Sequence, residues 1–250
     1  MNGFLFLMVF LFGLVIGSFL NVLIYRLPRG ISPAHGFSMC PSCEHRLYPI
    51  DLIPLFSWIG LKGKCRYCGA PISPRYPAVE LANALLWMAA FWRYGFGLPA
   101  LAMAAVCSCL LCIVFTDWEH MMIPDSFSIV MAGAGVLLLY TTDSPDWLER
   151  LIGAVCVSGL FLLIALVSGG RAMGGGDIKM MAALGLCLGW KLTLLTTMLG
   201  SVLGSAVLLI LHFTRFDRGR KAPFGTFLAV GGIAAILFGN EMILWYLGNL

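Results

Sequence analysis

The sequence predicts an all-α polytopic membrane protein of about eight transmembrane helices, with one small polar domain between the first two. Hydrophobic residues fill 60% of the 250 positions, and the mean hydropathy is +0.92. Only 11% of the residues are charged, against about 25% in soluble domains. So many apolar residues cannot share one buried core, and much of the surface must face lipid. This composition argues against a soluble globule, a disordered chain and a nucleic-acid-binding protein.

Apolar runs mark the expected helices, because backbone exposed to lipid must satisfy its own hydrogen bonds. The first run is expected to be a retained helix and not a secretory signal, since no basic residue precedes it and Arg26 and Arg29 follow it. The run 178–190 is short for a crossing, but without it the basic residues before the last helix would lie outside. The eight expected spans are 3–25, 78–94, 98–116, 126–142, 147–168, 178–190, 192–213 and 223–248.

Basic residues orient the chain across the membrane. With the N-terminus outside, all but three of the sixteen Lys and Arg residues fall in cytoplasmic segments, as the positive-inside rule expects. The three on the outer side are Arg93, Arg150 and Lys191. A cytoplasmic cluster before the last span consists of Arg215, Arg218, Arg220 and Lys221.

The polar insertion 26–77 divides the chain into three expected parts. Residues 1–25 form the first transmembrane helix, 26–77 a small cytoplasmic domain, and 78–250 the transmembrane catalytic domain. The insertion is rich in proline and glycine and has little periodic apolar sequence. A segment of about fifty residues with so small a core usually needs a metal or disulfides to hold one shape.

Four cysteines of this insertion form two CxxC pairs, Cys40 with Cys43 and Cys65 with Cys68. Two thiolates on one tight turn can bind a cation together, and two such turns supply the four ligands of a tetrahedral structural zinc site. Redox disulfides, or thiols without a role, are the alternative, but a cytoplasmic loop is kept reduced. Because a closed four-thiolate site has no open position, we expect the zinc to stabilise the fold and not to act in catalysis.

Two aspartates stand at the ends of expected spans, where ionisable groups indicate function. Asp117 follows the third span, and Asp177 ends the run Gly174-Gly175-Gly176-Asp177 at the start of the sixth. Two crossings separate them, so both return to the cytoplasmic face. Two close carboxylates share a proton, which suits acid–base hydrolysis of a peptide bond. The three glycines lack Cβ atoms and are expected to let a substrate strand approach.

The residue types alone leave other assignments open. Asp177 can equally serve as the N-cap of a helix that follows a flexible loop. Asp117 can be a solvated acid at the membrane interface, and Asp125 is a second N-cap candidate. Glu119 and His120 are available for the same chemistry on composition.

The chain resembles the type IV prepilin peptidases, a family of GxGD aspartic proteases with leader peptidase and N-methyltransferase activities. In such enzymes the first aspartate of a D-x6-P-D segment and the aspartate of GxGD form the dyad, which implies Asp117 and Asp177 here and a structural role for Asp125. Thr226 departs from the second proline that many relatives carry, and we expect it to affect only loop geometry. The matching motifs are Gly17 to Val22, Arg26 to Pro28, the two CxxC pairs, Arg75 to Pro77, Val79 to Leu81, Asp117 to Asp125, Gly174 to Asp177 and Pro223 to Gly225.

The resemblance implies cleavage of a basic leader from type IV prepilins or type II secretion pseudopilins at the cytoplasmic face of the bacterial inner membrane. N-methylation of the new terminus from S-adenosylmethionine would follow, with binding residues that the sequence does not assign. The expected partners are these substrates and membrane lipid, with no nucleic acid. A metal- or proton-coupled transporter with a zinc-ribbon regulatory loop is the alternative, but it predicts acids in the middle of spans. A zinc-ribbon membrane scaffold, in which both aspartates are dispensable, is a third interpretation.

Overall fold

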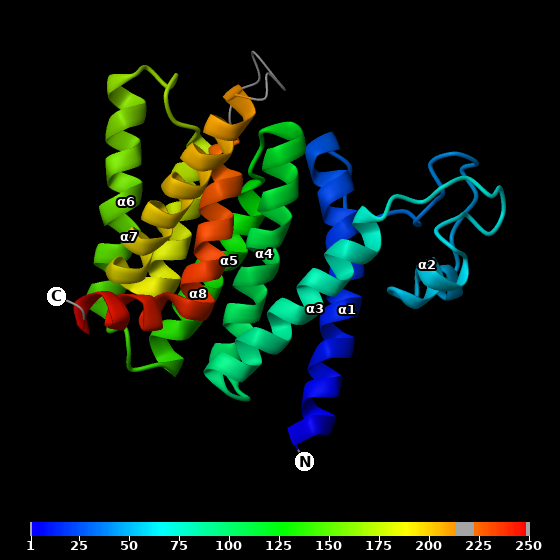
Figure 1. The fold of residues 1–250 in the computed structure, drawn as a ribbon, viewed down its shortest axis with the longest axis horizontal. Coiled ribbons are helices and arrows are strands. Elements are labelled where there is room, and N and C mark those ends of the chain that lie inside the picture. Colours follow the sequence, from blue (N-terminus) through cyan, green and yellow to red (C-terminus); the bar gives the residue numbers. More distant parts are fainter. Residues whose placement is uncertain (1, 214–222, 249–250) are drawn as a thin grey trace. The chain divides into compact units, whose positions relative to one another are not determined.

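The structure is a computed structural model that describes residues 2–213 and 223–248, and the expected basic cluster from Arg215 to Lys221 lies outside them. Within the described ranges, helices are the only regular secondary structure apart from the isolated bridges Met39–Arg46 and Lys64–Pro71 (Figure 1). Turns and loops connect the helices. The α-helices are α1 (Asn2–Arg26), α2 (Phe56–Gly60), α3 (Arg75–Tyr94), α4 (Leu98–His120), α5 (Asp125–Thr141), α6 (Trp147–Val167), α7 (Gly175–Phe213) and α8 (Phe224–Gly248). Two short 3-10 helices, η1 (Leu27–Arg29) and η2 (Pro49–Leu52), lie in the polar insertion.

The chain divides into two compact units, Met1–Trp92 and Arg93–Leu250. In the first unit, α1 and α3 pack as an antiparallel pair. A Cβ atom on Gly17 would lie 2.7 Å from the Cα of Glu80, so only glycine allows this approach of the two backbones. Asn83 donates to the carbonyl of Gly13 at 2.7 Å and ties the same helices together one turn further along.

The second unit contains a helix that is interrupted at Gly189, where φ is 74° and ψ is 171°. Only glycine reaches this conformation without strain. Before the interruption, Asp177 lies beside Gly225 and Leu184 lies beside Gly232. The first part of α7 therefore runs in the same direction as α8.

After the interruption the direction of α7 is reversed. Gly231 approaches Thr196, and Leu228 approaches Gly200, so residue numbers now rise in opposite directions on the two helices. The chain thus turns back at Gly189, and α7 is a hairpin of two helical parts, which Figure 1 shows as the passage from yellow to orange. The separate expected spans 178–190 and 192–213 correspond to these two parts.

A buried arginine closes the interrupted end of the first part. Arg150, on α6, is 1% exposed and donates to the carbonyl oxygens of Leu186 at 3.2 Å and Cys187 at 2.6 Å. It also donates to the carbonyl of Pro145 and the hydroxyl of Thr142. The last carbonyl groups of a helix have no partner within the helix and attract a cation. Arg150 therefore supplies their hydrogen-bond donors at the point where the chain turns back.

The count of eight spans is not confirmed. Within residues 2–213 and 223–248, five helical stretches are long and apolar enough to cross a membrane: Gly3–Arg29, Leu98–His120, Trp147–Val167, Gly175–Ile210 and Phe224–Gly248. Both parts of the hairpin lie within the stretch Gly175–Ile210. Asp125–Thr141 is apolar but has only 17 residues, and α3, which carries three charged side chains, is not among the five.

Candidate active site and metal site

The first aspartate ends a buried helix. Asp117 lies in the last turn of α4 and is 7% exposed. The helix stops at Met121, which adopts a left-handed conformation and returns its N–H to the Asp117 carbonyl at 2.9 Å. Ile123 and Pro124 complete the turn before α5 starts at Asp125. The local sequence therefore ends the helix just beyond Asp117 and holds that side chain at the end of α4.

The second aspartate begins a helix. Asp177 occupies the first turn of α7 and is 9% exposed, and the backbone of Gly174 hydrogen-bonds to its carboxyl group. Because α7 begins at Gly175, Asp177 is the third residue of the helix and not its N-cap, and the N-cap interpretation is wrong. The Asp177 carboxyl group instead binds back to the residue before the helix. Asp177 Oδ1 is buried and has no hydrogen-bond partner.

The structure brings the two carboxyl groups together around one glycine. A Cβ atom on Gly225 would lie 2.9 Å from Asp177 Oδ1 and 3.0 Å from Asp117 Oδ2. It would also lie 2.7 Å from Cδ1 of Ile123. Any side chain at Gly225 would therefore displace one of the carboxyl groups or Ile123. The site is thus formed by the last turn of α4, the first turn of α7 and the start of α8.

Thr226 binds one of the two carboxyl groups and not the other. Its backbone N–H donates to Asp117 Oδ2 at 2.7 Å, and its hydroxyl is 3.1 Å from the same oxygen. The hydroxyl also lies 3.3 Å from the Val114 carbonyl. From the sequence we expected this residue to affect only loop geometry, but it is a direct partner of Asp117.

Three further acidic or basic residues that the sequence left open lie outside the carboxyl pair. Asp125 is exposed and forms an ion pair with Lys179 at 2.8 Å, which links the starts of α5 and α7. This contact agrees with the structural role expected for Asp125. Glu119 and His120 face each other at 3.9 Å at the end of α4.

The three glycines expected to admit a substrate differ in their surroundings. A Cβ on Gly176 would lie 2.9 Å from the Cβ of Ile123, and one on Gly174 would lie 2.9 Å from Asp177 Oδ2. Gly175 has no neighbour within 4 Å of such an atom. Helix α7 already begins at Gly175, so the loop that precedes it is shorter than the sequence suggested.

The four cysteines of the insertion form a cluster that fits zinc. The sulfur atoms of Cys40, Cys43, Cys65 and Cys68 all lie within 4.8 Å of one another. Cys40 and Cys68 are 3.9 Å apart, close to the separation of about 3.8 Å that a tetrahedral ion with Zn–S bonds of about 2.3 Å imposes. These ligand types and spacings are those of a closed structural site.

Both cysteine pairs are presented by the same backbone turn. The N–H of Cys40 donates to the His45 carbonyl at 3.0 Å, and the N–H of Cys65 donates to the Ala70 carbonyl at 2.8 Å. Glu44 and Gly69 occupy equivalent places with positive φ values of 56° and 72°. The two CxxC pairs therefore lie on two turns of the same backbone form. Apart from the cysteine spacing, the sequence shows no repeat.

Hydrogen bonds favour a thiolate at the first cysteine. Desolvation raises the pKa of the Cys40 thiol, but the backbone groups of Cys43 and Ser42 and the thiols of Cys65 and Cys43 outweigh it and lower the pKa to about 6. Metal ligation requires this deprotonated form.

A carboxylate links the second knuckle to η2. Asp51 accepts from Arg66 Nε at 2.6 Å and from the Tyr67 hydroxyl at 2.9 Å. Burial works to raise the pKa of Asp51, but these bonds, together with the Tyr48 backbone, hold it below its ordinary value. The carboxyl side chain is 3% exposed.

Two family models match the chain in succession. The bacterial Peptidase A24 N-terminal domain matches residues 11–94, and the type IV leader peptidase family matches residues 104–209. The chain is 34% identical to an Aeromonas hydrophila protein named prepilin leader peptidase/N-methyltransferase, over 98% of this chain and 94% of the relative. The chain belongs to the type IV leader peptidase family.

Other members of the type IV leader peptidase family show the same extent of similarity. The Stutzerimonas stutzeri protein of that name is 35% identical over 94% of this chain and 91% of its own length. The Pseudomonas aeruginosa protein is 34% identical over 95% of this chain and 91% of its own length. No solved structure matches the chain. Both aspartates lie within the stretch that the leader peptidase model matches, and the four cysteines lie within the N-terminal one.

Proposed function

We propose that this protein is a membrane-embedded aspartic endopeptidase that removes leader peptides from type IV prepilins or related pseudopilins and then N-methylates the product. The observation that carries the peptidase is the pair of carboxyl groups around Gly225, in a chain whose relatives are named for this activity over nearly their whole length. The five apolar helices that could cross a membrane support a place in the bacterial inner membrane.

The two carboxyl groups have different partners, which suggests different roles in hydrolysis. Asp117 accepts two hydrogen bonds from Thr226, and such bonds favour the ionised form of a carboxylate. Asp177 Oδ1 has no partner and lies next to Asp117, so a shared proton is best placed there. We therefore assign Asp117 to take a proton from the attacking water and protonated Asp177 to polarise the scissile carbonyl. The proton held by Asp117 then passes to the leaving amine as the C–N bond breaks, which restores the starting state of the pair.

The three glycines are proposed as the place where the substrate strand passes. Gly174 and Gly176 allow close approach at Asp177 and Ile123, and Gly175 leaves open space. A side chain at Gly174 would meet Asp177 Oδ2, and one at Gly176 would meet Ile123. In the proposed topology this side of the membrane is cytoplasmic, where a basic leader would be presented.

The cysteine cluster is proposed to hold one zinc ion that stabilises residues 26–77 and takes no part in hydrolysis. Its support is the four sulfur ligands at tetrahedral spacing. Bound zinc would cross-link two turns in a segment with a small core. The chain is thus divided into a first helix of residues 1–25, this zinc-binding domain, and a peptidase domain of residues 78–250.

The methyl donor implied by the relatives' names is S-adenosylmethionine. The described residues contain no strand, and so they contain no strand–turn–helix unit of the kind that binds dinucleotides. We therefore propose no binding residues for this cofactor.

The transporter interpretation is not favoured. It requires acids in the interior of spans, whereas Asp117 and Asp177 lie in a last and a first helical turn. The family assignment also gives it no support.

The decisive experiment is incubation of the purified protein with a candidate prepilin, followed by mass analysis of both fragments. We expect cleavage between the basic leader and the apolar segment, and, when S-adenosylmethionine is added, a mature fragment heavier by one methyl group. Prepilins that remain intact with folded, zinc-loaded protein across several candidate sequences would contradict the proposed peptidase. Cleavage without the added methyl group would contradict only the second activity.

A further inference from the structure

One apolar segment of the polar insertion is not used by the zinc site or by the carboxyl pair. Residues 49–61 comprise η2, α2 and the turn between them, and Asp51 is their only charged residue. Trp58 faces inward, donating to the Ile72 carbonyl at 3.1 Å. Five large apolar side chains of the segment are exposed in the structure: Ile50, Leu52, Ile53, Phe56 and Ile59.

A buried glutamate fixes the depth of this segment along the first transmembrane helix. Glu80, on α3, accepts the N–H of Leu55 at 2.9 Å, and the Ser18 side chain of α1 hydrogen-bonds to the same carboxyl group. Leu55 adopts a φ of 60°, which is rare for a leucine, and α2 starts at the next residue. The start of α2 is therefore level with Ser18.

The position of Ser18 along α1 gives an estimate of how deep Leu55 lies in the membrane. Ser18 lies about 12 Å along the helix axis from Arg26, at 1.5 Å per residue. The helix has 25 residues and spans roughly 37 Å, against a hydrocarbon core of about 30 Å. Even if all of the excess length projects beyond the membrane at the Arg26 end, Ser18 still lies about 5 Å inside the core. Leu55 and the start of α2 then lie at the border of the hydrocarbon region or within it.

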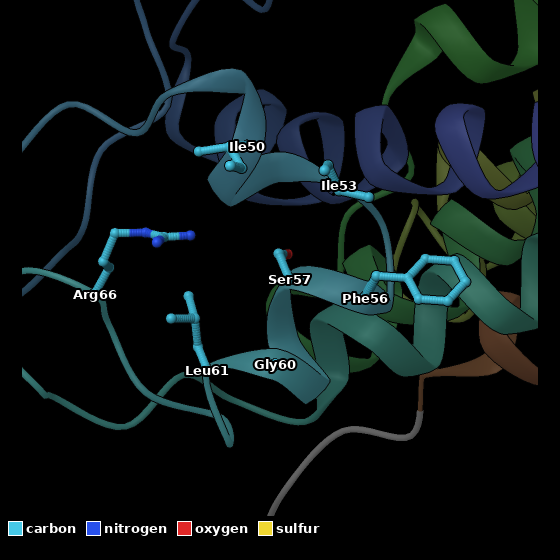
Figure 2. A pocket seen from close by; sticks show the side chains of 7 residues that line it. All are labelled: Ile50, Ile53, Phe56, Ser57, Gly60, Leu61 and Arg66. Carbon is cyan, nitrogen blue, oxygen red and sulfur yellow. The ribbon is translucent and has the colours of Figure 1, made fainter.

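An open hollow of about 310 Å³ lies between η2 and α2, and it is lined by Ile50, Ile53, Phe56, Ser57, Gly60, Leu61 and Arg66. Figure 2 shows Ile50 and Ile53 on one side of it and Leu61 on the other. Arg66 stands at its edge, where it binds Asp51. The only acid of the segment is thus paired and buried.

The charges around the segment fit a lipid surface. Lys62 follows residues 49–61 directly, and Lys64 comes two residues later. Basic residues at the end of an apolar segment are placed to meet anionic headgroups while the apolar side chains enter the acyl region.

We propose that residues 49–61 form an interfacial membrane anchor, in which Ile50, Ile53, Phe56 and Ile59 contact lipid acyl chains. The zinc-binding insertion is then held against the membrane at a third point, in addition to α1 and α3. This anchor is independent of the proposed peptidase chemistry.

The chain offers a matched control for a test of the anchor. Phe37 and Phe56 are both exposed phenylalanines of the insertion, at 57% and 66%. The Phe37 carbonyl binds the guanidinium of Arg26 at the end of α1, so Phe37 lies near that end and not at the level of Ser18. Each is replaced by the photoreactive p-benzoylphenylalanine, which retains the aromatic ring, in full-length protein reconstituted into vesicles of phosphatidylethanolamine and phosphatidylglycerol.

After illumination, the mass of the intact protein reports what each side chain touches. We expect phospholipid adducts at position 56 in several-fold greater yield than at position 37, with unchanged zinc content in both variants. If the Phe56 variant does not fold, the same probe at Ile59 takes its place with the same expectation. Equal yields at the two positions, or cross-links to protein in place of lipid at position 56, would overturn the anchor.

Discussion

At the scale of single residues, the site combines two carboxyl groups with unequal hydrogen bonding. Asp117 has two donors from Thr226, whereas Asp177 Oδ1 has none. A pair of this kind can hold one proton and one charge in defined places before the reaction starts. The difference in hydrogen bonding comes from Thr226 of α8, a helix that contributes no carboxylate to the site.

We predict that Asp117→Asn and Asp177→Asn each abolish leader cleavage while the protein remains inserted and zinc-bound. An amide has nearly the shape of a carboxyl group but cannot transfer the proton, so the loss would be chemical and not steric. Because the two groups act as a unit, the double variant should be about as inactive as either single one. Cleavage of a prepilin, measured by fragment mass, checks the prediction, and methylation of a pre-cleaved pilin should survive both changes.

Substantial cleavage by Asp177→Asn, combined with its loss in Glu119→Gln or Asp125→Asn, would show that the dyad is assigned wrongly. Asp125→Asn serves as a matched comparison, since it makes the same chemical change in an exposed ion pair with Lys179.

We predict that Thr226→Val lowers kcat for leader cleavage about tenfold, while Thr226→Ser keeps most of it. Valine preserves the shape and the backbone N–H but removes the hydroxyl bond to Asp117, and a hydrogen bond to a charged group contributes about 1.5–3 kcal/mol. A loss of about 1.4 kcal/mol in the transition state is a tenfold change in rate. Steady-state cleavage rates for the two variants check this, and equal rates for Thr226→Val and the original protein would show that the bond has no role.

The CxxC spacing of the cysteines carries a chemical meaning by itself, whereas the family resemblance implied the pair Asp117 and Asp177 after the residue types alone had left other assignments open. Their roles stay predictions. The sequence predicted that Thr226 affects only loop geometry, since its contact with Asp117 joins residues more than a hundred positions apart. The same limit applies to Gly225, whose role depends on two helices that the sequence does not place.

At the scale of elements, the start of α7 is positioned by close packing on the turn after α4. Gly176 meets Ile123 there, and a Cβ atom would lie 2.9 Å from the Ile123 Cβ, which cannot move without the backbone. The position of Asp177 therefore depends on the absence of a side chain one residue earlier.

We predict that Gly176→Val slows cleavage more than it lowers the amount of folded protein. The valine would push the first turn of α7 away from Ile123 and separate the two carboxyl groups. Gly133→Val is the control, because Gly133 lies in α5 and has no neighbour within 4 Å of an added Cβ. Cleavage rate is compared with the yield of monodisperse protein, and an equal fall in both for Gly176→Val would indicate a packing role alone.

The sequence predicted most helices within a few residues, because long apolar runs bounded by charges and turns define them. The division of 178–213 at Gly189 was also visible, although the reason for it was not. The carbonyl oxygens before the turn need hydrogen-bond donors, and Arg150 supplies them from α6. From the sequence, this arginine was expected only to lie on the outer side of the membrane. The segments η2 and α2 were not predicted, since so short a helix has no periodic signal.

At the scale of the whole molecule, the four-cysteine cluster and the carboxyl pair belong to different compact units. The cysteines lie in Met1–Trp92, and both aspartates with Thr226 lie in Arg93–Leu250. The two family models divide the chain at nearly the same place, ending at residue 94 and resuming at residue 104.

We predict one zinc ion per chain, and we expect Cys65→Ser to remove it and to loosen residues 26–77 while the membrane helices stay inserted. Three sulfur ligands cannot close the tetrahedral site, and metal binding in such a segment is coupled to its folding. Elemental analysis of protein purified without chelator measures the metal, and limited proteolysis reports the insertion. Cys109→Ser is the control, because Cys109 is buried in α4 and has no place in the cluster. Metal-free native protein, or the same proteolysis pattern in Cys65→Ser as in native protein, would contradict a zinc ion that holds this domain together.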